Sequence, residues 1–298
     1  MRYVPHPILA DWGPARLAIR AYGSSEWQQR AHSSRYCALR QWLLRSSREC
    51  PSLNTNPFLE PPAITVAPDL ALLLLHALPL DGRMWSKQMD IAPGRTFAPD
   101  LYKFGNRIQD WAASCIELIP HERFVIVGCS VGGSCALEIM RLAPDRVAGA
   151  VLIGTKARHD PDPEALSVSQ NTVENEGVAG AWERYWKPLF EQNSDVEVVQ
   201  IAQEIALAQS NTALISGLKS FHTRESREDV VRESTVPIQI VTGDRDELPG
   251  IDYSRRLVRL SKRAQLHIFK NCGHYVPMMQ PTKLNRLIAN TIAVASGR

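Results

Sequence analysis

The chain has 298 residues, enough for one large core domain or for a core domain that carries an inserted piece. Its 34 basic and 31 acidic residues give a formal net charge of +3, and this near balance argues against an electrostatic nucleic-acid binder. The longest apolar stretch, residues 70–80, is too short to span a membrane and contains His76 and Pro79, so we expect no membrane partner.

The first 68 residues differ in composition from the rest of the chain. Up to residue 60 every basic residue is arginine, serine pairs recur and acidic residues are few. Residues 34–45 have the spacing of an amphipathic helix, and the proline-rich residues 54–68 predict an extended linker with one edge strand at 64–66. We interpret residues 1–68 as an atypical, poorly ordered N-terminal extension; an interaction or targeting arm is the alternative.

From residue 70 onward, short apolar runs alternate with helical periodicity. Apolar runs of four to six residues are typical of strands buried on both faces of a parallel sheet. We expect strands at 70–75, 96–98, 124–127, 148–153, 238–241 and 266–269, and helices at 107–118, 131–142, 252–260 and 282–295. This alternation predicts an α/β protein with a doubly wound, mostly parallel sheet.

The alternation is interrupted once, between residues 153 and 238. Residues 161–234 predict several helices, which we expect to form a cap over the carboxyl edge of a core made of residues 69–160 and 235–298. Aromatic side chains recur at helical spacing in this segment, at Trp182, Tyr185, Trp186 and Phe190. They either wall an apolar pocket, with Trp182 and Trp186 as candidate substrate contacts, or pack the cap on the core.

A glycine-flanked serine follows one of the expected strands. The segment Gly-Cys-Ser-Val-Gly at 128–132 comes directly after the strand at 124–127 and opens the helix at 131–142. The G-x-S-x-G nucleophile elbow requires this strand-turn-helix context. The pattern therefore indicates Ser130 as a nucleophile, the alternative being a plain glycine turn between strand and helix.

A serine nucleophile needs a base and an orienting carboxylate. His274 lies in a loop after the last expected strand, and Asp246 and Asp244 lie in a loop after the strand at 238–241. The carboxyl ends of parallel strands meet at one edge of a sheet, so these loops lie at the same edge as Ser130. We expect His274 as the base and Asp246 as its carboxylate, with Asp244 as the second choice.

An acyl-transfer site also needs N–H donors for the developing oxyanion. The loop after the strand at 70–75 supplies the backbone N–H of Leu78, and the start of the helix at 131–142 supplies that of Val131. His76, in the same loop as Leu78, is expected to be structural and hydrogen-bonded beneath the loop.

Four motifs in this order resemble the α/β-hydrolase superfamily. They are His-Ala-Leu-Pro-Leu-Asp-Gly-Arg-Met-Trp at 76–85, Gly-Cys-Ser-Val-Gly-Gly at 128–133, Gly-Asp-Arg-Asp at 243–246 and Cys-Gly-His-Tyr at 272–275. The most similar branch holds 3-oxoadipate enol-lactonases, small serine esterases and C–C hydrolases. The resemblance covers residues 68–298 and implies the α/β-hydrolase fold with a helical cap, the triad Ser130, Asp246 and His274, and the oxyanion donors Leu78 and Val131.

The chain departs from this family pattern in three places. Ala77 stands where the family often has glycine, residues 99–106 replace a glycine-rich loop, and residues 1–68 lack the usual opening β-hairpin. The first departure affects the freedom of the oxyanion loop. The last concerns the start of the chain rather than the catalytic site.

These features predict a hydrolase of a small-molecule carboxylic ester or lactone that needs no cofactor and no metal. Arg83, Lys156 and Arg158 lie in loops near the site, where they either pair with a substrate carboxylate or remain solvated. A C–C bond hydrolase and a cofactor-free perhydrolase would use the same triad, and a non-catalytic ligand receptor on a hydrolase scaffold is a further alternative. Six cysteines without CxxC pairing favour reduced thiols and a cytoplasmic location. Homo-oligomerisation stays open.

Overall fold

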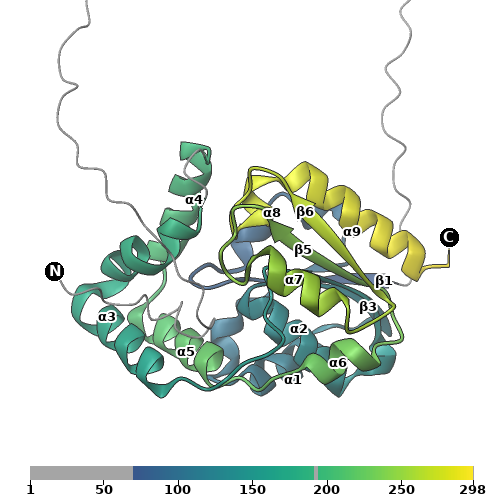
Figure 1. Cartoon of the computed structure of the whole chain (residues 1–298), viewed down its shortest axis with the longest axis horizontal. Coiled ribbons are helices and arrows are strands. Elements are labelled where there is room, and N and C mark those ends of the chain that lie inside the picture. Colours follow the sequence, from purple (N-terminus) through teal and green to yellow (C-terminus); the bar gives the residue numbers. More distant parts are fainter. Residues whose placement is uncertain (1–69, 191–193, 298) are drawn as a thin grey trace, which may run out of the picture. The chain divides into compact units, whose positions relative to one another are not determined.

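The computed structural model describes residues 70–190 and 194–297, drawn in colour in Figure 1. The extension at 1–68, with its expected helix at 34–45 and edge strand at 64–66, lies outside the described residues. Within these residues none of the helices combines the length and the apolar character needed to cross a membrane.

Six parallel strands form one sheet. They are β1 (Leu70–Leu75), β2 (Thr96–Phe97), β3 (Arg123–Cys129), β4 (Val147–Ile153), β5 (Ile238–Gly243) and β6 (Ala264–Phe269). Their order is β2-β1-β3-β4-β5-β6, and every neighbouring pair is parallel. All six residues of β1 are buried, as are all seven of β4, which explains their uninterrupted apolar sequences. The α/β fold class expected from the sequence is confirmed.

Helices cover both faces of the sheet. They include α1 (Ile108–Leu118), α2 (Val131–Leu142), α7 (Gly250–Val258), α8 (Val276–Met279) and α9 (Pro281–Ala295). Figure 1 shows α9 on one side of the strands and α1, α2 and α7 on the other. Short 3-10 turns lie at Gly82–Trp85, Met89–Ile91, Leu101–Phe104, Pro144–Arg146 and Lys187–Leu189. The sheet is therefore doubly wound.

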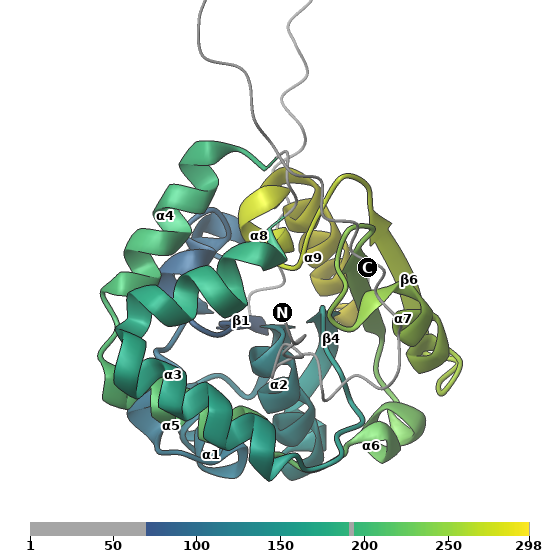
Figure 2. The same ribbon diagram turned by 60° about the vertical axis from the view of Figure 1, so that its left-hand side comes forward.

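The segment between β4 and β5 is helical. It contains α3 (Pro163–Ala181), a π-helical turn (Trp182–Trp186), α4 (Val196–Leu207), α5 (Asn211–His222) and α6 (Glu228–Glu233). Figure 2 shows α3, α4 and α5 grouped across from β6, α7 and α9. Trp182, Tyr185 and Trp186 are fully buried here, which is why their spacing in the sequence is helical.

The register of the sheet brings the loops after β1, β3, β4, β5 and β6 to one edge. Gly128 of β3 pairs with Leu75 at the end of β1, and Cys129 pairs with Ile153 at the end of β4. Likewise, the end of β5 pairs with the end of β6. The residues that directly follow these strands therefore gather at the carboxyl edge, where ligands bind in open α/β sheets.

Candidate active site

Ser130 occupies a strained turn between β3 and α2. Its backbone angles are φ 54° and ψ −116°, a conformation that non-glycine residues rarely adopt and that costs about 1–3 kcal/mol. A Cβ at Gly128 would lie 2.4 Å from the Gly132 carbonyl oxygen, and one at Gly132 would lie 2.2 Å from the Leu75 carbonyl oxygen. Only glycine fits on either side of the serine, as the G-x-S-x-G pattern requires.

His274 and Asp246 form a buried hydrogen-bonded pair. The Nδ1 atom of His274 lies 3.0 Å from Oδ2 of Asp246, and the two residues are 3% and 5% exposed. The second carboxylate oxygen, Oδ1, accepts the Leu248 N–H at 2.8 Å. A carboxylate can only accept, so Nδ1 carries the proton and Nε2 carries the lone pair of the neutral ring.

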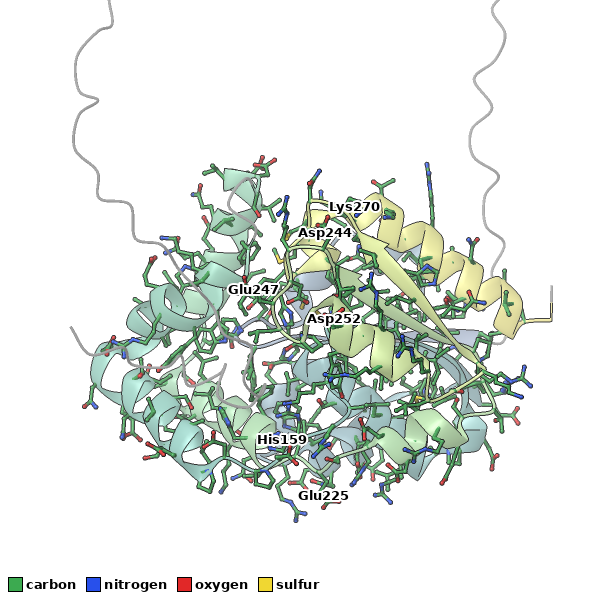
Figure 3. All side chains as sticks on the ribbon, in the orientation of Figure 1. His159, Glu225, Asp244, Glu247, Asp252 and Lys270 are labelled. Carbon is green, nitrogen blue, oxygen red and sulfur yellow. The ribbon has the colours of Figure 1, made fainter. Side chains whose placement is uncertain are left out.

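Asp244 has a different place. Its Oδ1 accepts the Cys272 N–H at 3.2 Å, and its Oδ2 lies 3.9 Å from Nζ of Lys270. Figure 3 shows Asp244 and Lys270 close together at the loops that follow β5 and β6. Asp244 thus joins these two loops to each other, while Asp246 is the carboxylate that contacts His274.

Gly154, directly after β4, lies against the His274–Asp246 pair. A Cβ at this position would be 2.7 Å from Cε1 and 2.8 Å from Nδ1 of His274, and 3.1 Å from Oδ2 of Asp246. Its φ of +52° also favours glycine. The sequence motifs did not predict this contact of Gly154. One signal for it was available in the sequence: Gly154 directly follows β4, and β4 lies between β3, which leads to Ser130, and β5, which leads to Asp246.

Ser130 and His274 line the same pocket. Its other described lining residues are Leu78, Trp186, Leu189, Phe221 and Leu248, and its empty volume is about 360 Å³. Trp186, one of the two tryptophans expected to contact substrate, is in this lining. Trp182 is not, because its indole packs against Phe190, with the ring centroids 6.0 Å apart.

Two backbone N–H groups at the carboxyl edge, those of Leu78 and Val131, have no acceptor among the described residues. Leu78 follows Ala77 in a turn closed by the Leu80 N–H, which donates to the Ala77 carbonyl at 2.9 Å. Val131 is the first residue of α2, so its N–H has no acceptor within the helix. Among residues 70–190 and 194–297, neither the Leu78 N–H nor the Val131 N–H has a hydrogen-bond partner. Alanine at position 77 is compatible with this turn.

Tyr275 holds the Leu78 loop from the other side. Its buried hydroxyl donates to the Leu78 carbonyl at 2.9 Å, and its ring stacks on Phe190 at 4.6 Å. Tyr275 therefore connects the loop of His274 to the loop of Leu78. The sequence motifs did not predict this role of Tyr275, although the tyrosine directly follows the histidine.

His76 is fully buried beneath the same loop. Its Nε2 accepts the Leu101 N–H at 2.9 Å, and Nδ1–H points to the Ala77 carbonyl at 3.2 Å. Burial lowers the pKa of His76 to about 4, so the ring is neutral at pH 7. The expected structural role is confirmed.

Three cationic side chains were expected near a substrate carboxylate, and all three lie outside the described lining of the Ser130 pocket. Arg83 donates to both oxygens of Asp81, from Nε at 3.0 Å and from Nη2 at 2.7 Å. Nε of Arg158 lies 3.4 Å from Asp160, and its side chain is 61% exposed. Lys156 is buried and lines a separate cavity. None of the three is in the described lining of the Ser130 pocket.

The chain is similar in sequence and fold to several known hydrolases. A pimeloyl-[acyl-carrier protein] methyl ester esterase of Aromatoleum aromaticum is 26% identical over 247 residues, which cover 74% of this chain and 97% of that protein. A 2-hydroxymuconate semialdehyde hydrolase of Pseudomonas sp. (strain CF600) is 23% identical over 254 residues, which cover 75% and 87%. The structure of the enol-lactonase from Burkholderia xenovorans LB400 shares the fold, with a TM-score of 0.68 at 15% identity over 76% of this chain and 92% of that one.

The model of the alpha/beta hydrolase family matches residues 72–287, which is well over half of the chain. The match includes the serine turn, the loop of Asp246 and the loop of His274. The resemblance stated from the sequence motifs is confirmed. The chain belongs to the alpha/beta hydrolase family.

Proposed function

We propose that this chain is a serine hydrolase that cleaves a carboxylic ester or lactone through an acyl-enzyme on Ser130. The observation that carries the proposal is the shared pocket of Ser130 and His274, with Asp246 hydrogen-bonded to the distal nitrogen of that histidine. This is the arrangement of nucleophile, base and orienting carboxylate that acyl transfer requires.

The proposed reaction has two halves. Ser130 Oγ attacks the carbonyl carbon, while Nε2 of His274 takes the hydroxyl proton and then gives it to the leaving alkoxide. Asp246 keeps the other ring nitrogen protonated and stabilises the imidazolium. A water molecule, deprotonated by His274, then attacks the acyl-enzyme and releases the carboxylic acid.

The Leu78 and Val131 N–H groups are the proposed oxyanion donors. Both lack an acceptor within the described residues, and Val131 adds the positive end of the α2 dipole. Tyr275 fixes the peptide plane that follows Leu78, since its hydroxyl holds the Leu78 carbonyl. Preorganised donors of this kind contribute about 10²–10³-fold each to kcat.

Hydrolysis of p-nitrophenyl butyrate by single-residue variants tests the proposal. We expect Ser130→Ala and His274→Ala to lose about 10⁴-fold or more in kcat, and Asp246→Asn to lose about 10³–10⁴-fold. Ser134→Ala is the matched control, because Ser134 lies one turn along α2 and lines the separate cavity instead. An active Ser130→Ala enzyme would refute the proposal.

A C–C bond hydrolase is the second candidate. The Pseudomonas relative with a semialdehyde substrate in its name matches about as well as the esterase does, at 23% against 26% identity. A purified chain that turns over a vinylogous diketone but no ester would favour this candidate. Tight ligand binding without turnover of either substrate would instead favour a receptor.

A further inference from the structure

The chemistry of the pocket beside Ser130 limits which esters can enter it. Leu78, Phe221 and Leu248 are each less than 10% exposed, so they form a fixed wall rather than a mobile surface. Trp186 and Leu189 complete the described lining apart from the two reacting residues. Among the described lining residues, the indole N–H of Trp186 is the only polar side-chain group besides those of Ser130 and His274, and none is an arginine or a lysine.

Arg83 and Arg224 are engaged outside this pocket. Arg83 is held by Asp81, whose Oδ2 also accepts from Nε2 of Gln209 at 2.7 Å. The Arg224 guanidinium lies over the Phe221 ring, 4.0 Å from its centroid, but Arg224 lines the separate cavity. The Asp246 carboxylate lies 3.0 Å from Nδ1 of His274, and its negative charge disfavours a second anion beside it.

We propose that the substrate is a neutral ester whose acyl chain is short and apolar, and that acyl chains ending in a carboxylate are excluded. This inference rests on the proposed function. The narrow pocket, walled by the buried side chains of Leu78, Phe221 and Leu248, fits a short apolar acyl chain better than a long or charged one. A carboxylate within four carbons of the reacting carbonyl would have to lose its water inside the apolar wall without gaining a cation. The enzyme therefore differs in substrate charge from a lactonase that acts on dicarboxylic acid derivatives.

Three methyl esters of equal acyl length test the inference on the full wild-type chain. Methyl butyrate and dimethyl succinate are neutral, and monomethyl succinate carries one carboxylate at pH 7.5. We expect kcat/KM for both neutral esters to exceed that for monomethyl succinate by at least about 100-fold, because the burial of one unpaired carboxylate costs several kcal/mol. Acid release in a pH-stat measures all three.

A charge-introducing variant gives a second readout. Leu189 is only partly buried, and its backbone carbonyl, which accepts the His274 N–H at 2.9 Å, is kept in any substitution. We expect Leu189→Arg to raise the ratio of monomethyl succinate to methyl butyrate turnover at least about tenfold. Leu189→Met, which adds no charge, should leave that ratio unchanged.

The outcomes separate this inference from the proposed function. Equal turnover of the neutral and anionic esters by the wild-type chain would overturn the inference and leave the serine hydrolase intact. A preference for monomethyl succinate over the neutral esters would also overturn the inference and leave the serine hydrolase intact. Absence of turnover for all three esters, together with no reaction with a fluorophosphonate, would refute the proposed function and the inference with it.

Discussion

One methyl group added at Gly154 should disturb the site without removing any reacting group. In Gly154→Ala the new Cβ would lie 2.7 Å from Cε1 of His274, against a normal carbon–carbon contact of about 3.5 Å. The imidazole must therefore move by roughly 0.8 Å, or push Asp246 away. A misplacement of about 1 Å costs on the order of 10²-fold in rate, so we expect kcat/KM for a p-nitrophenyl ester to fall by about 10–100-fold.

In Gly154→Ala, the cost of the left-handed backbone must be distinguished from the effect of the steric clash with His274. Alanine at φ +52° costs roughly 1–2 kcal/mol by itself. Gly94 has a similar φ of +73° and nothing within 4 Å of its Cβ position, so Gly94→Ala bears the same backbone cost without a contact. Urea unfolding should show comparable losses of stability in the two variants, and only Gly154→Ala should lose activity. Activity within twofold of wild type in Gly154→Ala would refute the reasoning about the His274–Asp246 geometry.

Three further predictions concern the groups around the site. Tyr275→Phe should lower kcat about tenfold with KM within twofold, since the Leu78 carbonyl loses its 2.9 Å partner; steady-state kinetics with unchanged kcat would contradict this. The pKa of His76 is about 4 in the folded chain, below its ordinary 6.5, so only the unfolded chain gains a proton as the pH falls below 6.5. The free energy of unfolding should decrease by up to roughly 3 kcal/mol from pH 6.5 to pH 4. In urea titrations, His76→Gln should show a smaller decrease over the same pH range. Arg227→Met should destabilise the fold by about 2 kcal/mol with kcat unchanged, because buried Glu138 loses its 2.6 Å partner but keeps Arg141 at 2.7 Å; equal unfolding midpoints would argue against it.

The sheet was predictable because its strands are buried on both faces. β1 and α2 begin and end where the apolar runs and the glycine turn indicated. β3 and β5 extend two residues further at their carboxyl ends, since Gly128 and Gly243 continue the ladder although glycine is a weak strand former. Chain order alone then placed the loops of Ser130, Asp246 and His274 at one edge.

The pocket wall was less predictable, because it depends on packing between distant segments. Trp182 and Trp186 have the same helical spacing, yet only Trp186 reaches the pocket, while Trp182 meets Phe190. Phe221 and Leu248 come from two other segments and gave no signal in the sequence. The partner of Arg83 is Asp81, two residues away, and Gln209, between α4 and α5, donates to the same carboxylate. Periodicity in a sequence indicates that a side chain is buried. It does not indicate which other side chains that residue contacts.

Reaction with a fluorophosphonate, followed by digestion and mass spectrometry, tests the role of Ser130 most directly. The account predicts a single adduct on the peptide that contains Ser130, absent in Ser130→Ala and retained in Ser134→Ala. His274→Ala should react far more slowly, because the hydroxyl then lacks its base. An adduct on another serine, or equal labelling of wild type and Ser130→Ala, would contradict the assignment of Ser130 as the nucleophile.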